Sequence, residues 1–174
     1  SANRVSDQPM PPAYQPWQQA DPQDSFEQLS ALMRAVHTEV VDLQDEPWQD
    51  WIKRELPLRG LSRVLVGGHP AGHALAEEPG DHLDISVYSE PVESFKYELF
   101  QKIEVGITHT LGGIAATGSL ILWPDAAEPR LLSLVPPVHI ALLDKKHIFQ
   151  DLPAVISSQN WANTMPTNAL LISG

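Results

Sequence analysis

Apolar residues recur at every third or fourth position from Ser25 onward, the spacing that places side chains on one face of an α-helix. Asp24 or Ser25 is placed to cap the first turn of this helix. Pro47 then opens a second, shorter helical pattern, since proline is well tolerated at the first position of a helix. We therefore expect an N-terminal helical extension over residues 25–57. Its apolar positions are Phe26, Leu29, Leu32, Met33, Val36, Val40 and Leu43, followed by Trp48, Trp51, Ile52 and Leu56.

After Pro57 the apolar residues gather into short runs that are typical of β-strands. Residues 91–102 instead have the apolar spacing of a helix. Such alternation predicts an α/β fold with a mainly parallel sheet flanked by helices. In open sheets of this kind ligands bind at the carboxyl ends of the strands, near a switch in strand order. The expected strands are 63–66, 83–88, 103–107, 119–123, 138–143 and 169–172.

The start of the chain differs in composition from the rest. Residues 1–24 are rich in proline and glutamine and bury too little surface to offset the entropy of ordering. We interpret 1–24 as a flexible tail, 25–57 as the helical extension and 58–174 as one α/β domain. Tyr14 and Trp17 are either incidental aromatics of the tail or anchors that dock it on a neighbouring surface.

The composition disfavours several classes of function. Apolar residues make up 43% of the chain, which is normal for a domain that buries a substantial core. The 11 Lys and Arg residues stand against 22 Asp and Glu, and this negative charge disfavours binding to nucleic acid or anionic lipids. No apolar stretch approaches the roughly 20 residues of a membrane span, and no signal peptide is recognisable. We expect a cytoplasmic protein without membrane insertion.

The sequence contains no Cys, so the chain cannot form disulfides or hold zinc or an iron–sulfur cluster through thiolates. Histidine ligands remain to be considered, and His69, His73 and His82 follow the strand expected at 63–66. A helix could place the first two on one face, but Pro70, Gly72 and Gly80 argue against a helix of useful length. We therefore interpret these as solvated loop histidines and expect no metal site.

A glycine-rich segment, 108–119, follows the strand expected at 103–107 and carries several hydroxyl side chains. Glycine allows close backbone approach, and exposed N–H groups in such turns can bind a carboxylate or a phosphate. The segment matches neither the dinucleotide-binding glycine pattern nor a P-loop. An anion site and a purely structural turn therefore both remain open.

Three blocks, Gly113–Leu120, Arg130–Ile140 and Leu170–Gly174, resemble in order and spacing the LUD domain of the lactate-utilisation protein C family, also called LutC/YkgG. The likeness covers residues 60 to 174. It implies a fold similar to the NagB/RpiA/CoA-transferase group. It also implies a role in oxidising lactate to pyruvate beside partner proteins that carry iron–sulfur clusters, while this chain holds no cofactor of its own.

The chain departs from the family pattern in two places. Ala116 stands where family members commonly have an acidic residue before the Thr-Gly pair, which weakens an enzymatic interpretation. Relatives also continue past the position of Gly174, so part of the family's site would be absent, disordered or outside this sequence. Glu104 is the nearest acidic alternative to the missing carboxylate.

The candidate site residues follow from these motifs. His139, alternating with Val138 and Ile140 in an expected strand, is either a general base or a hydrogen-bonded structural histidine. Arg130 is either an anion ligand or half of a surface ion pair. We expect ligand binding by Thr108, Gly112, Gly113, Thr117, Gly118, Ser119, Arg130 and His139, and the weak candidates for catalysis are His139 and Glu104.

The leading hypothesis is a component of lactate utilisation that acts with iron–sulfur partner proteins and binds a small anionic metabolite. One alternative is a stand-alone enzyme or binding protein for a phosphorylated, CoA-linked or folate-like metabolite, which rests on fold analogy. Another is a structural or regulatory module without a ligand, for which we expect an exposed apolar patch and no convergent polar pocket beside Thr117. The sequence leaves open whether the chain is an enzyme.

Overall fold

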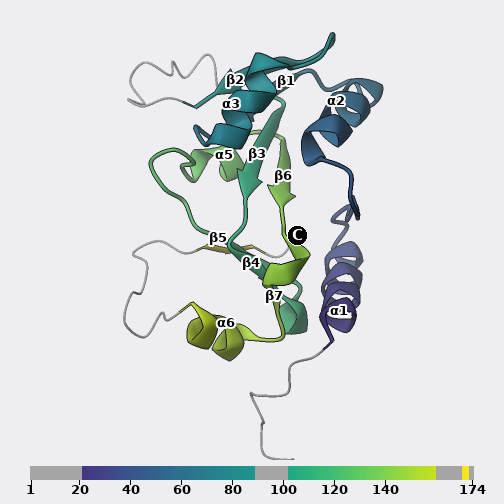
Figure 1. Cartoon of the computed structure of the whole chain (residues 1–174), viewed down its shortest axis with the longest axis vertical. Helices are drawn as coiled ribbons and strands as arrows, with labels where there is room; N and C mark the ends of the chain where they lie inside the picture. The colour runs from purple at the N-terminus through teal and green to yellow at the C-terminus, as the bar shows by residue number, and fades with distance from the viewer. Residues whose placement is uncertain (1–20, 89–101, 160–169, 173–174) are drawn as a thin grey trace, which may run out of the picture.

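The structure of the chain, a computed structural model, describes residues 21–88, 102–159 and 170–172 (Figure 1). Residues 91–101 of the expected helix and the tail up to residue 20 lie outside these ranges. The described residues form two four-stranded sheets, one above the other in Figure 1, with helices packed against both. The fold is α/β with a parallel sheet flanked by helices, as the sequence predicts, but the second sheet was not expected.

The first sheet, called sheet A here, is entirely parallel and has the strand order β2-β1-β3-β6. Helices cover both faces, as is usual for parallel strands. Ile52 of α2 and Leu75 of α3 pack on the face that carries Val64, and Leu132 of α5 packs with Leu65 on the other. The elements are β1 (Arg63–Val66), β2 (Asp84–Val87), β3 (Val105–His109), β6 (Val138–Leu142), α2 (Trp48–Leu58), α3 (Pro70–Glu77) and α5 (Leu131–Leu134).

The second sheet, sheet B, is mixed and has the order β7-β4-β5-β8. Leu29 of α1 packs with Leu120 on one face, and Val155 of α6 packs with Ile121 on the other. The 3-10 helix η2 joins β4 to β5, and η3 precedes β7. The elements are β4 (Gly112–Ile114), η2 (Ala115–Thr117), β5 (Ser119–Leu122), η3 (Lys145–His147), β7 (Ile148–Phe149), β8 (Leu170–Ile172), α1 (Pro22–Ala35) and α6 (Leu152–Ser158).

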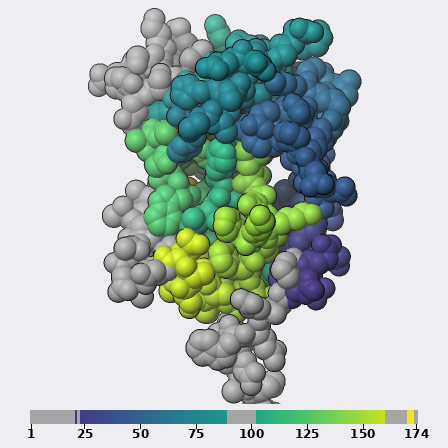
Figure 2. Space-filling view, in the orientation of Figure 1, coloured from purple at the N-terminus to yellow at the C-terminus, as the bar shows by residue number. Residues whose placement is uncertain are grey.

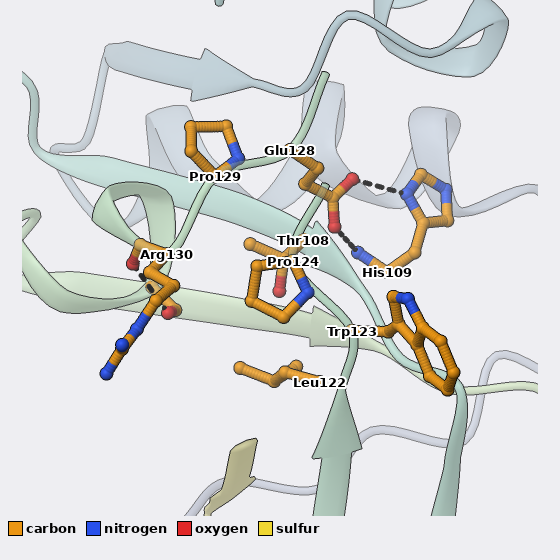
Figure 3. Close-up of a pocket in the computed structure, with 9 residues that line it drawn as sticks. Thr108, His109, Leu122, Trp123, Pro124, Glu128, Pro129 and Arg130 are labelled. Atoms are coloured by element: carbon orange, nitrogen blue, oxygen red, sulfur yellow. Dashed lines mark hydrogen bonds and ion pairs between the residues drawn. The ribbon is translucent and has the colours of Figure 1, made fainter. Parts of the chain in front are cut away.

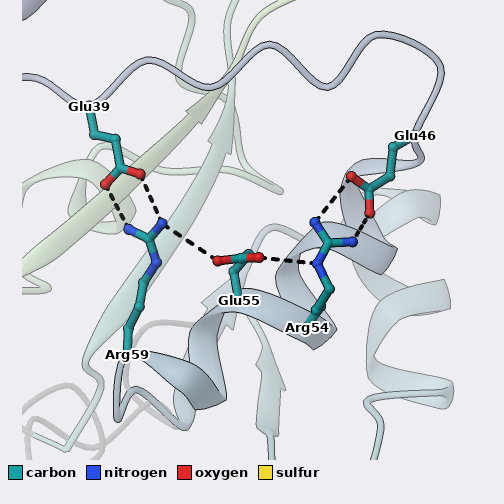
Figure 4. Close-up of polar contacts among 5 residues, drawn as sticks. All are labelled: Glu39, Glu46, Arg54, Glu55 and Arg59. Atoms are coloured by element: carbon teal, nitrogen blue, oxygen red, sulfur yellow. Dashed lines mark hydrogen bonds and ion pairs between the residues drawn. The ribbon is translucent and has the colours of Figure 1, made fainter.

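The helical extension spans both sheets, because α1 packs on sheet B and α2 on sheet A (Figure 1). Residues 36–47, the connector, join the two helices. Glu39 and Glu46 of the connector pair with Arg59 and Arg54 at α2, and Glu55 contacts both arginines (Figure 4). Lys145 next to sheet B also reaches the connector, where its Nζ lies 2.5 Å from Asp42 Oδ2.

Several predictions about helices are wrong. The first helix begins at Pro22, within the expected tail, and its cap is Asp21 rather than Asp24 or Ser25. The first helix ends at Ala35 rather than near Leu43, because His37 adopts a φ of 69° and Thr38 N–H bonds to Met33 O across the helix end. The loop expected after β1 is the helix α3. Its glycine serves close packing, since a Cβ on Gly72 would lie 2.2 Å from Gly67 O.

None of the helices in the described ranges is long and apolar enough to cross a bilayer. The surface is visibly hollowed between α2 and β6 (Figure 2). This hollow is described below, after the site at the end of sheet A.

Candidate functional site

The strand order of sheet A has a switch point between β1 and β3. The chain leaves β1 through α3 on the face of Val64, whereas it enters β6 through α5 on the opposite face. In open α/β sheets such a reversal leaves a crevice at the carboxyl ends of the two strands, where ligands bind. Here the crevice lies between Gly67 and Gly68, which follow β1, and His109, which ends β3.

Glu128 occupies this crevice and is buried. Asp125 shapes the loop that carries it, since its Oδ1 accepts hydrogen bonds from the N–H groups of Ala127 (2.8 Å) and Glu128 (2.7 Å). Gly68 N–H anchors the loop to the end of β1 through Ala127 O (2.8 Å). Gly67 makes room for the carboxylate, because a Cβ there would lie 2.9 Å from Glu128 Oε2.

His109 donates two hydrogen bonds to the Glu128 carboxylate (Figure 3). Its backbone N–H bonds to Oε1 at 2.5 Å, and its ring Nδ1 lies 3.0 Å from Oε2. A carboxylate accepts hydrogen bonds, so Nδ1 carries the proton and Nε2 is the nitrogen left for another partner. The hydrogen bond to Glu128 raises the pKa of His109, against an opposing effect of partial burial.

Two further rings surround the His109 imidazole. Trp48 of α2 meets it edge-on with ring centroids 6.3 Å apart, so the helical extension contributes a wall of the site. His69 meets it edge-on at 5.9 Å. His69 Nε2 lies 3.4 Å from Asp125 Oδ2 and 3.8 Å from Glu128 Oε2, so both histidines face the same acidic loop.

A second histidine, His139, contacts a threonine across the strands β3 and β6. Their register places Gly106 beside His139, so His139 and Thr108 share one face of the sheet. Thr108 Oγ1 lies 2.8 Å from His139 Nε2. Burial lowers the pKa of His139, although the charge of Glu128 opposes the shift. A hydrogen-bonded, neutral imidazole at this position fits the structural interpretation of His139.

A small cavity of about 10 Å³ lies behind Glu128, which is about the space of one water molecule. Thr108 and Arg130 supply polar groups to its lining (Figure 3), and so does Ser133. His109 and His139 also line a far larger groove, of about 1060 Å³, on the side of α2 and the connector. His109 therefore stands between the buried carboxylate and an open groove that a ligand can enter.

The structure brings only some of the predicted site residues to this crevice. Thr108 and His139 lie beside it, and Arg130 lines the small cavity with its guanidinium directed away from Glu128 (Figure 3). No ion pair joins Arg130 to any residue of the described ranges. Its predicted role as an anion ligand stays a prediction.

Glu104 lies at the opposite end of β3, far from the crevice along the strand. Its Oε2 accepts hydrogen bonds from the backbone N–H groups of Ser62 (2.9 Å) and Arg63 (3.0 Å), and its Oε1 pairs with the Arg63 guanidinium at 2.9 Å. These hydrogen bonds lower the pKa of Glu104. The contacts fix the start of β1, and its candidacy as a catalytic residue remains a prediction.

From Gly112 onward the glycine-rich segment lies in sheet B, where it forms the strand β4, the 3-10 helix η2 and the start of β5 rather than a single turn. A Cβ would lie 2.5 Å from His147 O at Gly112, 2.8 Å from Leu29 Cδ2 at Gly113 and 2.6 Å from Leu32 Cβ at Gly118, whose φ is 63°. These glycines make room for neighbouring backbone and apolar side chains. Ligand binding by this segment remains a prediction.

Two hydroxyls at the η2 end of the segment bond to each other. Thr117 Oγ1 donates to Ser119 Oγ at 3.0 Å. The exposed Ala116, where the family pattern has an acid, donates its N–H to Gln150 O at 2.9 Å. Neither contact belongs to the crevice of sheet A.

The sequence prediction missed Glu128, His109 and His69. Both histidines stand where a buried strand ends, and that position was the available signal. Glu128 had no such signal, because the loop after β5 brings it to the end of β3 only in the folded structure. Among the described residues, no group of three His, Cys, Asp or Glu side chains is arranged to hold a metal ion.

Comparison with known proteins decides the family. The family model of the LUD domain matches residues 26–174, which is most of the chain. The chain belongs to the LUD domain family. The match includes nearly all of the helical extension as well as the α/β region.

One relative of this LUD domain is an uncharacterized protein of Neisseria meningitidis serogroup B, 33% identical over 151 residues. The alignment covers 83% of this chain and 64% of the relative, so the chain spans less than two thirds of that protein's length. The crystal structure of a DUF162 family protein from Deinococcus radiodurans is similar over 89% of this chain and 90% of its own, with 15% identity and a TM-score of 0.48.

Proposed function

We propose that this LUD domain is a cytoplasmic component of lactate utilisation, the oxidation of L-lactate to pyruvate, and that it acts with iron–sulfur partner proteins. Its own contribution is a binding site for a small carboxylate metabolite at the end of sheet A. The observation that carries the proposal is the His109–Glu128 pair, which is set at a strand-order switch point beside an open groove.

The pair suits a carboxylate ligand. With Nδ1 bonded to Glu128 and its pKa raised, His109 remains protonated at higher pH than an isolated imidazole and presents Nε2–H as a charged donor. A charge-assisted hydrogen bond to a carboxylate is stronger than a neutral one. Such a donor matters here, because the net charge of −11 repels anions from most of the surface.

The redox centres belong to the partners in this proposal. Iron–sulfur clusters are commonly held by cysteine thiolates, and the sequence of this chain has no Cys. The residues of this chain therefore do not fit a cluster of that kind. Its part is to bind and orient the metabolite, and the electrons of lactate oxidation pass to a partner.

Calorimetric titration with L-lactate and with pyruvate tests the binding site. We expect binding at pH 6 that weakens about tenfold or more in His109→Gln, since a charge-assisted hydrogen bond contributes about 1.5–3 kcal/mol. Thr117→Val is the matched control, because Thr117 belongs to the part of the glycine-rich segment that lies in sheet B. Equal loss in both variants, or loss in Thr117→Val alone, would move the site to sheet B and reject His109.

A genetic experiment tests the role in lactate utilisation separately. Deletion of the gene is expected to abolish growth on L-lactate as sole carbon source, and the natural gene is expected to restore it. Co-purification of the tagged protein with iron–sulfur proteins, detected by their iron content and visible absorbance, tests the partners. Normal growth of the deletion strain would reject this part of the proposal.

A second candidate function rests on the size of the groove. Its volume of about 1060 Å³ lies at the upper end of the range typical of small-molecule sites and exceeds what lactate needs. A larger metabolite that is phosphorylated, CoA-linked or folate-like would fill more of it. A thermal-shift screen with CoA, nucleotides and folates distinguishes the two, since a ligand that binds only the folded state raises its stability.

A further inference from the structure

The loop from Pro124 to Pro129 carries Glu128 to the end of β3. Proline restricts φ at both ends of this loop, so the conformational freedom that remains lies in the four residues between them. Two of these four are alanines, which have no polar side chain. Asp125 is therefore the residue of the loop whose side chain can hold Glu128 in place by hydrogen bonds.

Asp125 closes the loop around Glu128. Its Oδ1 accepts hydrogen bonds from the N–H groups of Ala127 at 2.8 Å and Glu128 at 2.7 Å. Neither of these N–H groups bonds to a backbone carbonyl within the described ranges. The Asp125 N–H in turn donates to Glu128 O at 3.2 Å. One residue thus holds the main chain of Glu128 through both its N–H and its C=O group.

The position of this main chain decides whether Glu128 reaches His109. The Glu128 side chain is buried, and its Oε2 lies 3.0 Å from His109 Nδ1 (Figure 3). A displacement of about 1 Å would lengthen this contact beyond the usual range of a hydrogen bond. A glutamate side chain also has several rotatable bonds, and fixing them costs entropy. The contact with His109 therefore depends on a loop that is already ordered.

The charge of Asp125 offers another route to His109, but the geometry disfavours it. Among the described residues, Glu128 and His69 are the titratable side chains in contact with His109. No ion pair in these ranges joins Asp125 to His109, and Asp125 Oδ2 lies 3.4 Å from His69 Nε2 instead. Nearly half of the Asp125 side chain is exposed, so water screens its charge. Its short hydrogen bonds are the stronger interaction.

We propose that Asp125 is a positioning residue of the carboxylate site, which holds the Glu128 carboxylate against His109 through the two hydrogen bonds that its Oδ1 accepts. Asp125 acts through Glu128 and contacts no ligand itself. The inference rests on the proposed function for the ligand that His109 binds, whereas the effect on His109 is a property of the free protein.

Three variants of Asp125 separate hydrogen bonding from charge. Asp125→Asn keeps an acceptor oxygen at the same distance from the main chain and removes the charge. Asp125→Glu keeps the charge but moves both oxygens outward by a methylene group, and Asp125→Ala removes charge and acceptor together. The matched control is Asp151→Ala, because Asp151 Oδ1 also accepts a backbone N–H, that of Ala154 at 2.9 Å, but does so at the start of α6.

NMR titration of the full-length protein without a ligand is the first measurement, with the His109 signal assigned from the spectrum of His109→Gln. Glu128 raises the pKa of His109. We expect this pKa to fall toward the ordinary value of about 6.5 in Asp125→Ala and Asp125→Glu, and to keep its natural value in Asp125→Asn and Asp151→Ala. An unchanged pKa in Asp125→Glu, or an equal fall in Asp125→Asn, would overturn the proposal. These two variants decide the question even where Asp125→Ala does not fold.

Calorimetric titration with L-lactate is the second measurement. An imidazole of ordinary pKa is mostly neutral at pH 7.5 and mostly charged at pH 5.5. We therefore expect Asp125→Glu to bind L-lactate several-fold more weakly than the natural protein at the higher pH and about equally at the lower pH. Asp125→Asn is expected to bind like the natural protein at both. An equal loss in Asp125→Glu at both pH values would mean that Asp125 only supports the fold, and would overturn the proposal.

The two measurements also separate this inference from the proposed function. If the natural protein binds no lactate while the pKa of His109 follows the expected pattern, the proposed ligand is wrong and the positioning role of Asp125 stands. If the natural protein binds lactate through His109 and the pKa is the same in all variants, the positioning role is wrong and the ligand stands.

Discussion

Glycine serves opposite purposes in the two sheets. At the end of β1 in sheet A, Gly67 leaves space for a charged group, and Glu128 fills that space in contact with His109. In sheet B, Gly112 and Gly113 leave space for a carbonyl and for a leucine methyl group. The sequence alone makes the second region look the more promising site, since it holds more glycines. A glycine cluster indicates close approach, and only the approaching group tells whether the approach concerns ligands or packing.

The largest expected effect is on packing in sheet B. Gly112→Ala places a Cβ 2.5 Å from the backbone oxygen of His147, which cannot move without shifting β7. We expect a loss of about 2–3 kcal/mol in the free energy of unfolding, measured by urea denaturation, as for overpacked cores. Lactate binding by the fraction that folds is expected to stay normal. Selective loss of lactate binding at full stability would instead make Gly112 part of a ligand site.

In sheet A, Glu128→Gln removes the negative charge beside His109. We expect it to lower the free energy of unfolding by about 1–2 kcal/mol near pH 6. Glu128 raises the pKa of His109 in the folded state, so its contribution is complete below the unfolded pKa of about 6.5 and is lost as the pH rises through the folded value. The stability difference between the natural protein and the variant should therefore shrink from pH 6 to pH 9. A difference that is constant over this range would contradict the charged pair.

His139 has the opposite pH dependence. Burial lowers its folded pKa, so the unfolded chain binds the proton more readily, and stability is lost as the pH falls below about 6.5. His139→Gln removes the contact with Thr108 and is expected to lower the free energy of unfolding by about 1 kcal/mol at pH 8. The loss is expected to be smaller at pH 5, where the natural protein is itself destabilised by proton uptake on unfolding. Urea denaturation at the two pH values measures this, with His73→Gln on the exposed side of α3 as control.

The smallest expected effect is that of Thr117→Val. Its hydroxyl is exposed and bonds to Ser119, so we expect a stability change below about 0.5 kcal/mol and no change in lactate binding. Thermal denaturation and calorimetry measure the two quantities. A large loss of binding would show that the glycine-rich segment holds the ligand after all.

The sequence predicted the local elements of sheet A well. The expected strand at 63–66 is β1, and the expected 138–143 contains β6, because β-branched runs between turn residues are local signals. The prediction for α3 failed, since Gly72 serves a contact with Gly67 O that the sequence does not display. The predicted end of α1 was wrong for a similar reason. Val40 continues the helical spacing of apolar residues, but it lies in the connector and packs on sheet B from there.

The site was harder to predict than the fold. Thr108 and His139 were expected to bind ligand, and they contact each other across two strands. The pairing of Glu128 with His109 depends on a loop that leaves β5 and returns to the end of β3. A contact of this kind is set by tertiary packing and has no local pattern, so spacing along the chain cannot reveal it.

The connector has a mechanical consequence. Helix α1 packs on sheet B and α2 packs on sheet A. The connector between them is held to α2 by Glu39 and Glu46 and to Lys145, next to sheet B, by Asp42. The extension therefore acts as a strut across the two sheets. Neither sheet can swing away from the other without stretching this strut or breaking its ion pairs. The extension therefore opposes any change in the width of the groove beside β6, and the packing of its two helices contributes more to this than the exposed ion pairs do.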